Sequence, residues 1–279
     1  MGALDNVARN NVSCFLDTME RTDEGELKEI VQKSSEAQKV VEDGSLTYED
    51  DRSHRYTADC KVIVSGKRTL EAAKEYAGKR VCVLNFANAF HPGGGVKSGA
   101  TAQEESICRI STLYRNLTDP KMINAFYRRH EIIEMDFLGN DDCIYTPDVC
   151  VFKTDEQDPA LLAKDDRYFV DVITCAAPDL RGVGFALKPK GDKAKALYEK
   201  RIRAIFEIAR LNGADVLILG AFGCGAFFND PQTVAAAFKV ITDEYRRDFE
   251  TIEYAVFCKT NQTKNYDIFK AALGEEQDA

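Results

Sequence analysis

Blocks of apolar and polar residues alternate along the chain and predict strands and helices in turn. Short apolar runs typical of buried strands lie at 60–65, 81–86, 144–145, 149–152, 168–177, 216–220 and 252–258. Between them, apolar residues recur at helical spacing at 68–77, 102–116, 119–131, 193–212 and 231–249. Strands that are apolar on both faces and separated by helices are typical of a largely parallel, two-sided sheet. The pattern therefore predicts an α/β domain over residues 60–274.

The first 59 residues follow a different pattern. Residues 26–42 carry apolar side chains at helical spacing, and Gly44 marks the end of that predicted helix. Residues 45–59 are mostly polar and predict a loop. We therefore expect an N-terminal helical accessory region over residues 1–59, followed by the α/β domain.

Composition narrows the possible functions. The 279 residues have a formal net charge of -9, which argues against a broad basic surface for nucleic acid. A small anionic ligand is still compatible, because backbone N–H groups can hold it. No apolar run is long enough to span a membrane, and the N-terminus has no basic segment followed by an apolar stretch. We expect an intracellular protein, cytoplasmic or nuclear, that binds neither nucleic acid nor membrane.

The cysteines favour a reduced protein. There are nine, an odd number, and no two are spaced as Cys-x-x-Cys. Free thiols in apolar runs behave as small hydrophobic groups. With only three histidines in the chain, we expect neither a disulfide framework nor a metal site.

The first segment with candidate chemistry is residues 85–109. It leaves a predicted buried strand, passes three consecutive glycines, Gly93, Gly94 and Gly95, and enters a predicted helix. Ligands of open α/β sheets bind beyond the carboxyl ends of strands. Glycines permit positive φ and close approach of the backbone, and we expect their N–H groups to be free to point at anionic oxygens.

The second segment is residues 216–231, where another buried strand enters a glycine-rich loop. Asp230 is expected to cap the next helix, with Pro231 in its first turn. The glycine spacing matches neither a P-loop nor a dinucleotide fingerprint. Each loop alone can be a tight turn, but two such loops before two helices together predict a diphosphate site.

Two acids follow the first loop. Glu104 and Glu105 stand where acidic residues favour the helix dipole, so a structural role is one interpretation. A carboxylate beside a phosphate loop is repelled by the ligand, however, which favours a chemical task such as protonating a leaving oxygen. Asn85 and Asn88 offer amides near this loop. Of Phe227 and Phe228, one is expected in the core and one over a ligand ring or sugar.

These motifs resemble the poly(ADP-ribose) glycohydrolase branch of the macrodomain superfamily, particularly its shorter microbial type. The signature is a triple glycine followed a few residues later by Gln-Glu-Glu, and here seven residues separate Gly95 from Gln103-Glu104-Glu105. Asn85 and Asn88 match a macrodomain-like Asn-x-x-Asn, and residues 220–231 look like the diphosphate loop of the family. The resemblance covers roughly residues 45–270. It implies a three-layer α/β/α fold with a central mixed, largely parallel sheet and an N-terminal helical extension.

The resemblance also implies an activity and a set of site residues. The family cleaves the ribose–ribose O-glycosidic bond of poly(ADP-ribose) and releases ADP-ribose without a cofactor. Glu105 would be the general acid and base, and Glu104 would hold the ribose hydroxyls. The residues implied in binding ADP-ribose are Asn85, Asn88, Gly93, Gly94, Gly95, Gln103, Gly223, Cys224, Gly225, Ala226 and Phe227. The expected partners are poly(ADP-ribose), ADP-ribose and ADP-ribosylated proteins, with the enzyme as a monomer.

Some positions depart from the family pattern. Phe228 stands where a small residue is more usual, and Asp179 where similar proteins often have Asn. The chain lacks the long inserted loop of the longer members, so we expect mainly terminal (exo) cleavage. The alternatives left open are a non-catalytic ADP-ribose reader and a mono-ADP-ribosyl hydrolase. A metal-dependent α/β enzyme is disfavoured, because no His or Asp cluster accompanies the loops.

Overall fold

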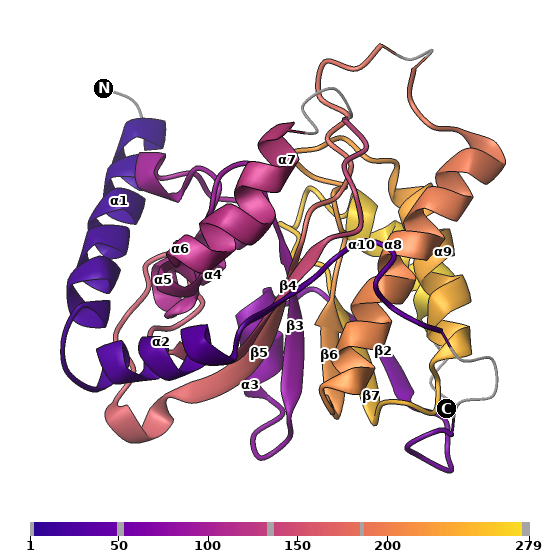
Figure 1. Cartoon of the computed structure of the whole chain (residues 1–279). Helices are drawn as coiled ribbons and strands as arrows, with labels where there is room; N and C mark the ends of the chain where they lie inside the picture. The colour runs from indigo at the N-terminus through magenta and orange to yellow at the C-terminus, as the bar shows by residue number, and fades with distance from the viewer. Residues whose placement is uncertain (1–2, 49–52, 133–136, 185–186, 275–279) are drawn as a thin grey trace. The chain divides into compact units, whose positions relative to one another are not determined.

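The structure is a computed structural model of the chain and describes residues 3–48, 53–132, 137–184 and 187–274 (Figure 1). The chain forms two compact units. The first unit comprises residues 1–41, 85–136 and 142–176, and the second comprises residues 42–84, 137–141 and 177–279. The accessory region and catalytic domain expected from the sequence, with their boundary near residue 60, stay predictions.

The first unit contains most of the short helices and the antiparallel strands. Its helices are α1 (Ala3–Thr22), α2 (Gly25–Ala37), η1 (Val96–Ser98), α4 (Gln103–Ile110), α5 (Leu113–Leu117), α6 (Pro120–Met122), the π-helix η2 (Ile123–Tyr127), α7 (Arg128–Ile132) and η3 (Lys164–Asp166). Its strands are β1 (Lys39–Val41), β4 (Cys143–Val151) and β5 (Tyr168–Cys175). β4 pairs antiparallel with β1 on one side and with β5 on the other.

The predicted helix over 26–42 is wrong at its end. α2 stops at Ala37, and β1 follows with Val40 opposite Ile144 of β4. Gln38 leaves the helix with an extended ψ of 145°, and its side-chain amide donates to Thr146 Oγ1 at 2.8 Å. The β-branched Val40 and Val41 suit a strand, and a partner strand more than a hundred residues away decides the outcome.

The predicted helix over 102–116 is also two helices. α4 ends at Ile110, and Ser111 is extended with a φ of -138°. The N–H of Thr112 donates to the carbonyl of Cys150 in β4 at 3.0 Å, and Ser111 bridges Val151. Backbone pairing with β4 therefore interrupts the helix. The strands predicted at 144–145 and 149–152 are, in turn, one strand with an irregularity between Thr146 and Val149.

The second unit carries the parallel sheet predicted from the apolar runs. Its strands are β2 (Lys61–Ser65), β3 (Val81–Phe86), of which residues 81–84 lie in this unit, β6 (Val216–Leu219) and β7 (Thr251–Ala255). They pair in the order β3-β6-β7-β2, and every pair is parallel. The expected mixed α/β fold is confirmed, since parallel pairs outnumber antiparallel pairs in the chain.

Helices and aromatic side chains build the core of the second unit. Its helices are α3 (Thr69–Lys74), α8 (Gly191–Leu211), α9 (Pro231–Glu244) and α10 (Lys264–Leu273). α9 packs against both α8 and α10, and α3 packs against β6 and β7. Phe238 of α9 makes ring contacts with Tyr254 of β7 and Phe269 of α10. The sequence patterns predicted α3, α8 and α9, whereas they missed α10 and α1.

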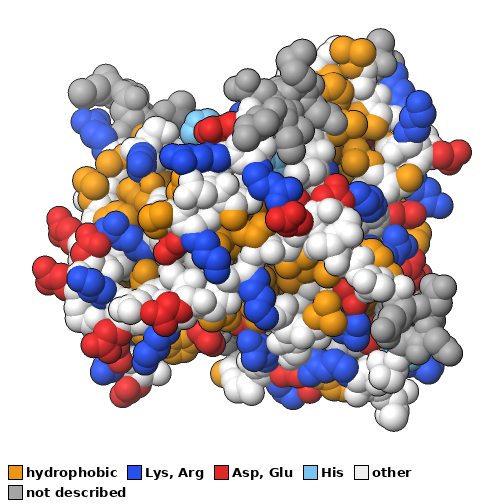
Figure 2. All heavy atoms as spheres, in the orientation of Figure 1, with side chains coloured by type: hydrophobic (Ala, Val, Ile, Leu, Met, Phe, Trp, Pro, Cys, Tyr) orange, Lys and Arg blue, Asp and Glu red, His pale blue; other side chains and the backbone are white. Residues whose placement is uncertain are grey.

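The state of the cysteines and the distribution of charged side chains on the surface are those of an ordinary globular protein. All nine cysteines are free, and six of them are buried. Across the described residues, no helix is long and apolar enough to cross a membrane. On the face drawn in Figure 2, basic and acidic side chains are interspersed rather than gathered into one basic area.

Candidate active site

The two acids of the Gln-Glu-Glu motif lie in the first turn of α4, in the first unit. Glu104 and Glu105 are both buried, with 3% and 7% of their surface exposed. Gln103 connects this turn to the end of β3, because its Oε1 accepts the N–H of Phe86 at 2.9 Å. Buried carboxylates require hydrogen-bond donors, and the loop between β3 and α4 supplies them.

Glu104 accepts three N–H groups, two from this loop and one from the end of β3. Its Oε2 accepts the backbone N–H of Asn88 at 2.8 Å. Its Oε1 accepts the N–H of Gly93 at 3.2 Å and the side-chain amide of Asn85 at 3.3 Å. A carboxylate has about four lone-pair positions, so Glu104 retains capacity for about one further donor such as a hydroxyl.

The environment of Glu104 strongly raises the pKa of its carboxyl group. The pKa of Glu104 is raised from 4.5 to about 8, mainly by burial and also by the neighbouring Glu105 charge, against the opposing effect of the hydrogen bond from the Asn88 N–H. The raised pKa favours the protonated form of Glu104 near neutral pH.

Glu105 is held by one oxygen only. Its Oε1 accepts the N–H of Gly95 at 2.8 Å. Its Oε2 is buried and has no hydrogen-bond partner among the described residues. An unpartnered buried carboxyl oxygen costs free energy, and a ligand that supplies a partner relieves this cost. The arrangement suits an acid whose second oxygen faces a substrate.

The triple glycine serves these acids directly, which corrects the expectation of free N–H groups. Gly93 and Gly95 donate to Glu104 and Glu105, and Gly94 donates to the carbonyl of His91 at 2.9 Å. Gly93 and Gly94 have φ values of 70° and 55°, which favour glycine. A Cβ on Gly93 would lie 2.7 Å from the ring of Tyr114. Contact of these glycines with a diphosphate stays a prediction.

Asn88 keeps one side-chain group available. Its Oδ1 accepts the N–H groups of Phe90 and His91, both at 2.9 Å, and so closes a tight turn. Its Nδ2 donates to none of the described residues, so it can donate to a sugar hydroxyl. Asn85 differs, because it is fully buried and its amide is occupied by Glu104 and Thr174.

The second glycine-rich loop follows β6 in the second unit. The N–H groups of Gly225, Ala226 and Phe227 donate to none of the described residues. Successive free N–H groups in a turn are suited to anionic oxygens. Cys224 contributes no anion, because burial raises the pKa of its thiol well above the ordinary value. This loop therefore retains the free donors that the first loop lacks.

Buried side chains fix the shape of the second loop. Asn229, 3% exposed, donates to the carbonyls of Pro178 and Gly223, both at 2.9 Å, and accepts the Tyr198 hydroxyl. Asp230 caps α9 by accepting the N–H of Thr233 at 3.0 Å, as predicted. The loop is thus held at its base while Gly225–Phe227 face outward.

The positions of Phe227 and Phe228 differ from the expectation that one of the two rings lies in the core. Phe227 is half-buried, and the guanidinium of Arg181 lies 5.0 Å from the centre of its ring. Asp179 holds Arg181 in an ion pair. Asp179 therefore positions the cation over Phe227. Phe228 is 65% exposed with a φ of 57°, so neither ring enters the core.

A pocket that the sequence patterns missed follows β7 in the second unit. It has a volume of about 420 Å³ and is lined by Phe257, Cys258, Lys259, Gln262, Lys264 and Asn265. Phe257 is 49% exposed, with Arg68 stacked at 4.4 Å. β6 and β7 are parallel neighbours, so this pocket and the second loop follow strand ends at one edge of the sheet. The sequence pattern placed Phe257 inside the strand predicted over 252–258, whereas β7 ends at Ala255.

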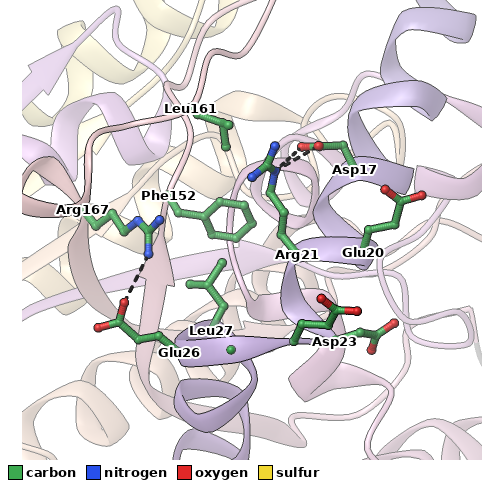
Figure 3. Close-up of a pocket in the computed structure, with 11 residues that line it drawn as sticks. Asp17, Glu20, Arg21, Asp23, Glu26, Leu27, Phe152, Leu161 and Arg167 are labelled. Carbon is green, nitrogen blue, oxygen red and sulfur yellow. Dashed lines mark hydrogen bonds and ion pairs between the residues drawn. The ribbon is translucent and has the colours of Figure 1, made fainter.

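A larger cavity in the first unit carries the opposite charge. It has a volume of about 820 Å³ and opens at the turn between α1 and α2 (Figure 3). Five carboxylates line it, those of Asp17, Glu20, Asp23, Glu24 and Glu26, against two guanidinium groups, those of Arg21 and Arg167. It contains none of the predicted site residues, and its excess negative charge repels phosphates. Among the described side chains no acidic, His or Cys cluster has metal-binding geometry.

Comparisons with protein-family models and with solved structures point to the same family. A family model for the catalytic domain of microbial-type PARG, where PARG is poly(ADP-ribose) glycohydrolase, matches residues 11–154, slightly more than half of the chain. A comparison with curated protein sequences gave no significant match.

Solved structures of bacterial PARG resemble the chain over most of its length. The crystal structure of PARG from Thermomonospora curvata has 27% identity and a TM-score of 0.82, covering 95% of this chain and 100% of that chain. The same enzyme bound to the inhibitor ADP-HPD has 27% identity and a TM-score of 0.81, covering 94% and 99%. PARG from Deinococcus radiodurans in complex with ADP-ribose has 28% identity and a TM-score of 0.76, covering 87% and 96%.

Proposed function

Because the chain belongs to the microbial-type poly(ADP-ribose) glycohydrolase family, we infer that it is a glycosidase that hydrolyses poly(ADP-ribose). We further propose Glu105 as its general acid and base. The observation that carries this assignment is the Glu105 carboxyl itself, which has one oxygen held by Gly95 and the other buried without a partner among the described residues.

The proposed reaction uses one carboxyl group twice. Protonated Glu105 gives its proton to the glycosidic oxygen as the bond from that oxygen to the anomeric carbon breaks. The oxocarbenium-like centre is attacked by water, which returns a proton to Glu105. The buried Oε2 of Glu105, which has no partner among the described residues, supports the first step, because this oxygen is available to the substrate. The negative diphosphate of the substrate supports the second, because it lies beside the developing positive charge.

Glu104 and Asn88 are proposed to bind the ribose of the scissile unit. Glu104 has about one lone-pair position left after its three N–H donors, which matches one sugar hydroxyl. The free Nδ2 of Asn88 supplies a donor to another sugar oxygen. Together they orient the sugar while Glu105 transfers the proton.

The second unit is proposed to bind the nucleotide part of the substrate. The free N–H groups of Gly225, Ala226 and Phe227 suit phosphate oxygens. Phe257 offers an exposed ring beside two lysines, which suits a base and a neighbouring phosphate. Neither proposal requires a cofactor.

The direct test replaces the proposed acid. Glu105→Gln keeps the size of the side chain but cannot cycle a proton, so release of ADP-ribose from poly(ADP-ribose) should fall at least about a hundredfold. Binding of ADP-ribose, measured by calorimetry, should stay within about threefold of wild type. Glu36→Gln, on the exposed surface of α2, is the matched control. An active Glu105→Gln enzyme would remove Glu105 from the mechanism.

The same assay separates the alternatives. A wild-type chain that binds ADP-ribose but releases none from the polymer would be a reader. A chain that cleaves only single ADP-ribose units from a modified protein would be a mono-ADP-ribosyl hydrolase. We propose mainly terminal cleavage, so ADP-ribose should accumulate from the start while long chains shorten gradually. Early release of oligomers would indicate internal cleavage.

A further inference from the structure

One face of α1 lies against the segment that carries the two acids. Asn11, Phe15 and Thr18 recur every three or four residues and therefore share a face of the helix. All three are buried, with 5%, 3% and 0% of their surface exposed. α1 contacts both η1 and α4, and Figure 1 shows α1 in indigo at the start of the chain.

Asn11 holds the loop before α4. Its Nδ2 donates to the carbonyl of Gly99 at 2.9 Å. Gly99 has a φ of 79°, and a Cβ there would overlap the backbone carbonyl of Ala8. The helix backbone and the loop are thus in direct contact at Gly99, and a glycine is required there.

Hydrogen bonds connect Gly99 to Glu105. Gly99 closes the η1 turn, and the next residue, Ala100, donates its N–H to the carbonyl of Gly95 at 3.2 Å. Ser98 donates its N–H to the same carbonyl at 3.0 Å. The N–H of Gly95 is the donor to Glu105 Oε1. The turn that Asn11 holds therefore fixes Gly95, the residue whose N–H orients the proposed acid.

The same face of α1 holds the other end of α4. The Thr18 hydroxyl donates to the carbonyl of Arg109, in the last turn of α4. Carbonyls at a helix C-terminus lack partners within the helix, so this contact satisfies one of them. Lys153, 2% exposed, donates to Thr18 Oγ1 at 2.7 Å and to the Cys14 carbonyl at 2.8 Å.

We propose that α1 clamps the loop and helix that carry the two acids, and that Asn11 is a positioning residue for Glu105. This inference rests on the proposed catalytic role of Glu105. Asn11 acts through Gly99, the η1 turn and Gly95, and touches no substrate. Loss of its N–H donor leaves the carbonyl of Gly99 without this partner and releases the turn. Gly95 then no longer holds Glu105 Oε1 in one place.

The test compares two adjacent asparagines. Asn11→Leu keeps nearly the volume of the side chain and removes the donor, and Asn11→Ala removes both. Asn10→Leu and Asn10→Ala are the matched controls, because Asn10 is exposed on the same helix. Both Asn11 variants should lower kcat on poly(ADP-ribose) about tenfold or more, since small displacements of a reacting group cost large factors. KM and the Kd for ADP-ribose should stay within about twofold, because the N–H groups of Gly225–Phe227 are unaltered.

Each outcome decides the question. A wild-type chain without activity refutes the proposed function, independently of the clamp. An active wild type with a normal kcat in Asn11→Leu overturns the clamp alone. The kcat is expressed per folded molecule, with the folded fraction measured by circular dichroism, so a normal kcat per folded molecule also overturns it. Thr18→Val supplies a second variant if Asn11→Leu fails to fold: it removes the donor to Arg109, and an unchanged kcat there would argue against the clamp.

Discussion

The carboxylate of Glu105 occupies the space where a side chain at position 94 would stand. A Cβ on Gly94 would lie 2.5 Å from Glu105 Oε1 and 3.1 Å from Glu104 Oε2. Gly94 also has a φ of 55°. The middle glycine of the triplet is therefore required twice, for its backbone conformation and for the room that it leaves to both acids.

Gly94→Ala should separate these two requirements. Its control is Gly25→Ala, because Gly25 has a φ of 56° and no atom near its hypothetical Cβ. Both variants should lose about 1 kcal/mol of stability from backbone strain. Only Gly94→Ala should also lose hydrolysis, by about a hundredfold, because the methyl group displaces Glu105. Steady-state kinetics and thermal melting measure the two effects, and equal activity of the two variants would contradict the assignment.

Glu104 should make stability depend on pH. Its pKa is raised from 4.5 to about 8, so the folded state holds a proton that the unfolded state releases. This contribution is full below about pH 4.5 and is lost as the pH rises through about 8. Across that window, the unfolding free energy of wild type should fall more steeply than that of Glu104→Gln, by up to about 1.4 kcal/mol per pH unit. Urea unfolding at several pH values measures both slopes, and parallel slopes would show that Glu104 does not titrate there.

Asn229 should stabilise the second loop. Asn229→Ala removes two donated hydrogen bonds and the acceptor of Tyr198, which should cost about 2–3 kcal/mol. Tyr198→Phe removes one of these bonds and should cost about 1 kcal/mol. Binding of ADP-ribose should weaken more in Asn229→Ala, because the N–H groups of Gly225–Phe227 lose their support. Denaturant unfolding measures the loss of stability in each variant, and calorimetry measures the binding of ADP-ribose. A larger effect of Tyr198→Phe than of Asn229→Ala would contradict the prediction.

We expect the backbone at Phe228 to be strained and its side chain to take no part in hydrolysis. Its φ of 57° is unfavourable for a bulky residue, and its ring is 65% exposed. Phe228→Gly should be more stable than Phe228→Ala by about 1 kcal/mol, since only glycine relieves the strain. Both variants should hydrolyse poly(ADP-ribose) at rates near wild type. A large loss of activity in both would instead assign the ring a place beside the substrate.

The helix that clamps the first loop, α1, was not predicted from the sequence. The inner face of α1 carries Asn11 and Thr18 beside Phe15, so this face makes hydrogen bonds as well as apolar contacts. Local patterns likewise placed Val40 and Val41 in a helix, since nothing in the neighbouring sequence shows their partner strand. Buried strands such as β3 and β6 were predicted well, because continuous apolar character is a local signal.

The amino-acid sequence by itself determined the α/β class, the parallel strands and the chemical identity of the acids and glycines. Only the tertiary structure decided how these groups are used. It places the N–H groups of Gly93 and Gly95 on carboxylates rather than leaving them free, and it leaves Glu105 Oε2 without a partner. The physical reason is that a hydrogen bond depends on the distance and angle between atoms that the sequence separates. Apolar burial, in contrast, depends on residue type and can be read along the chain.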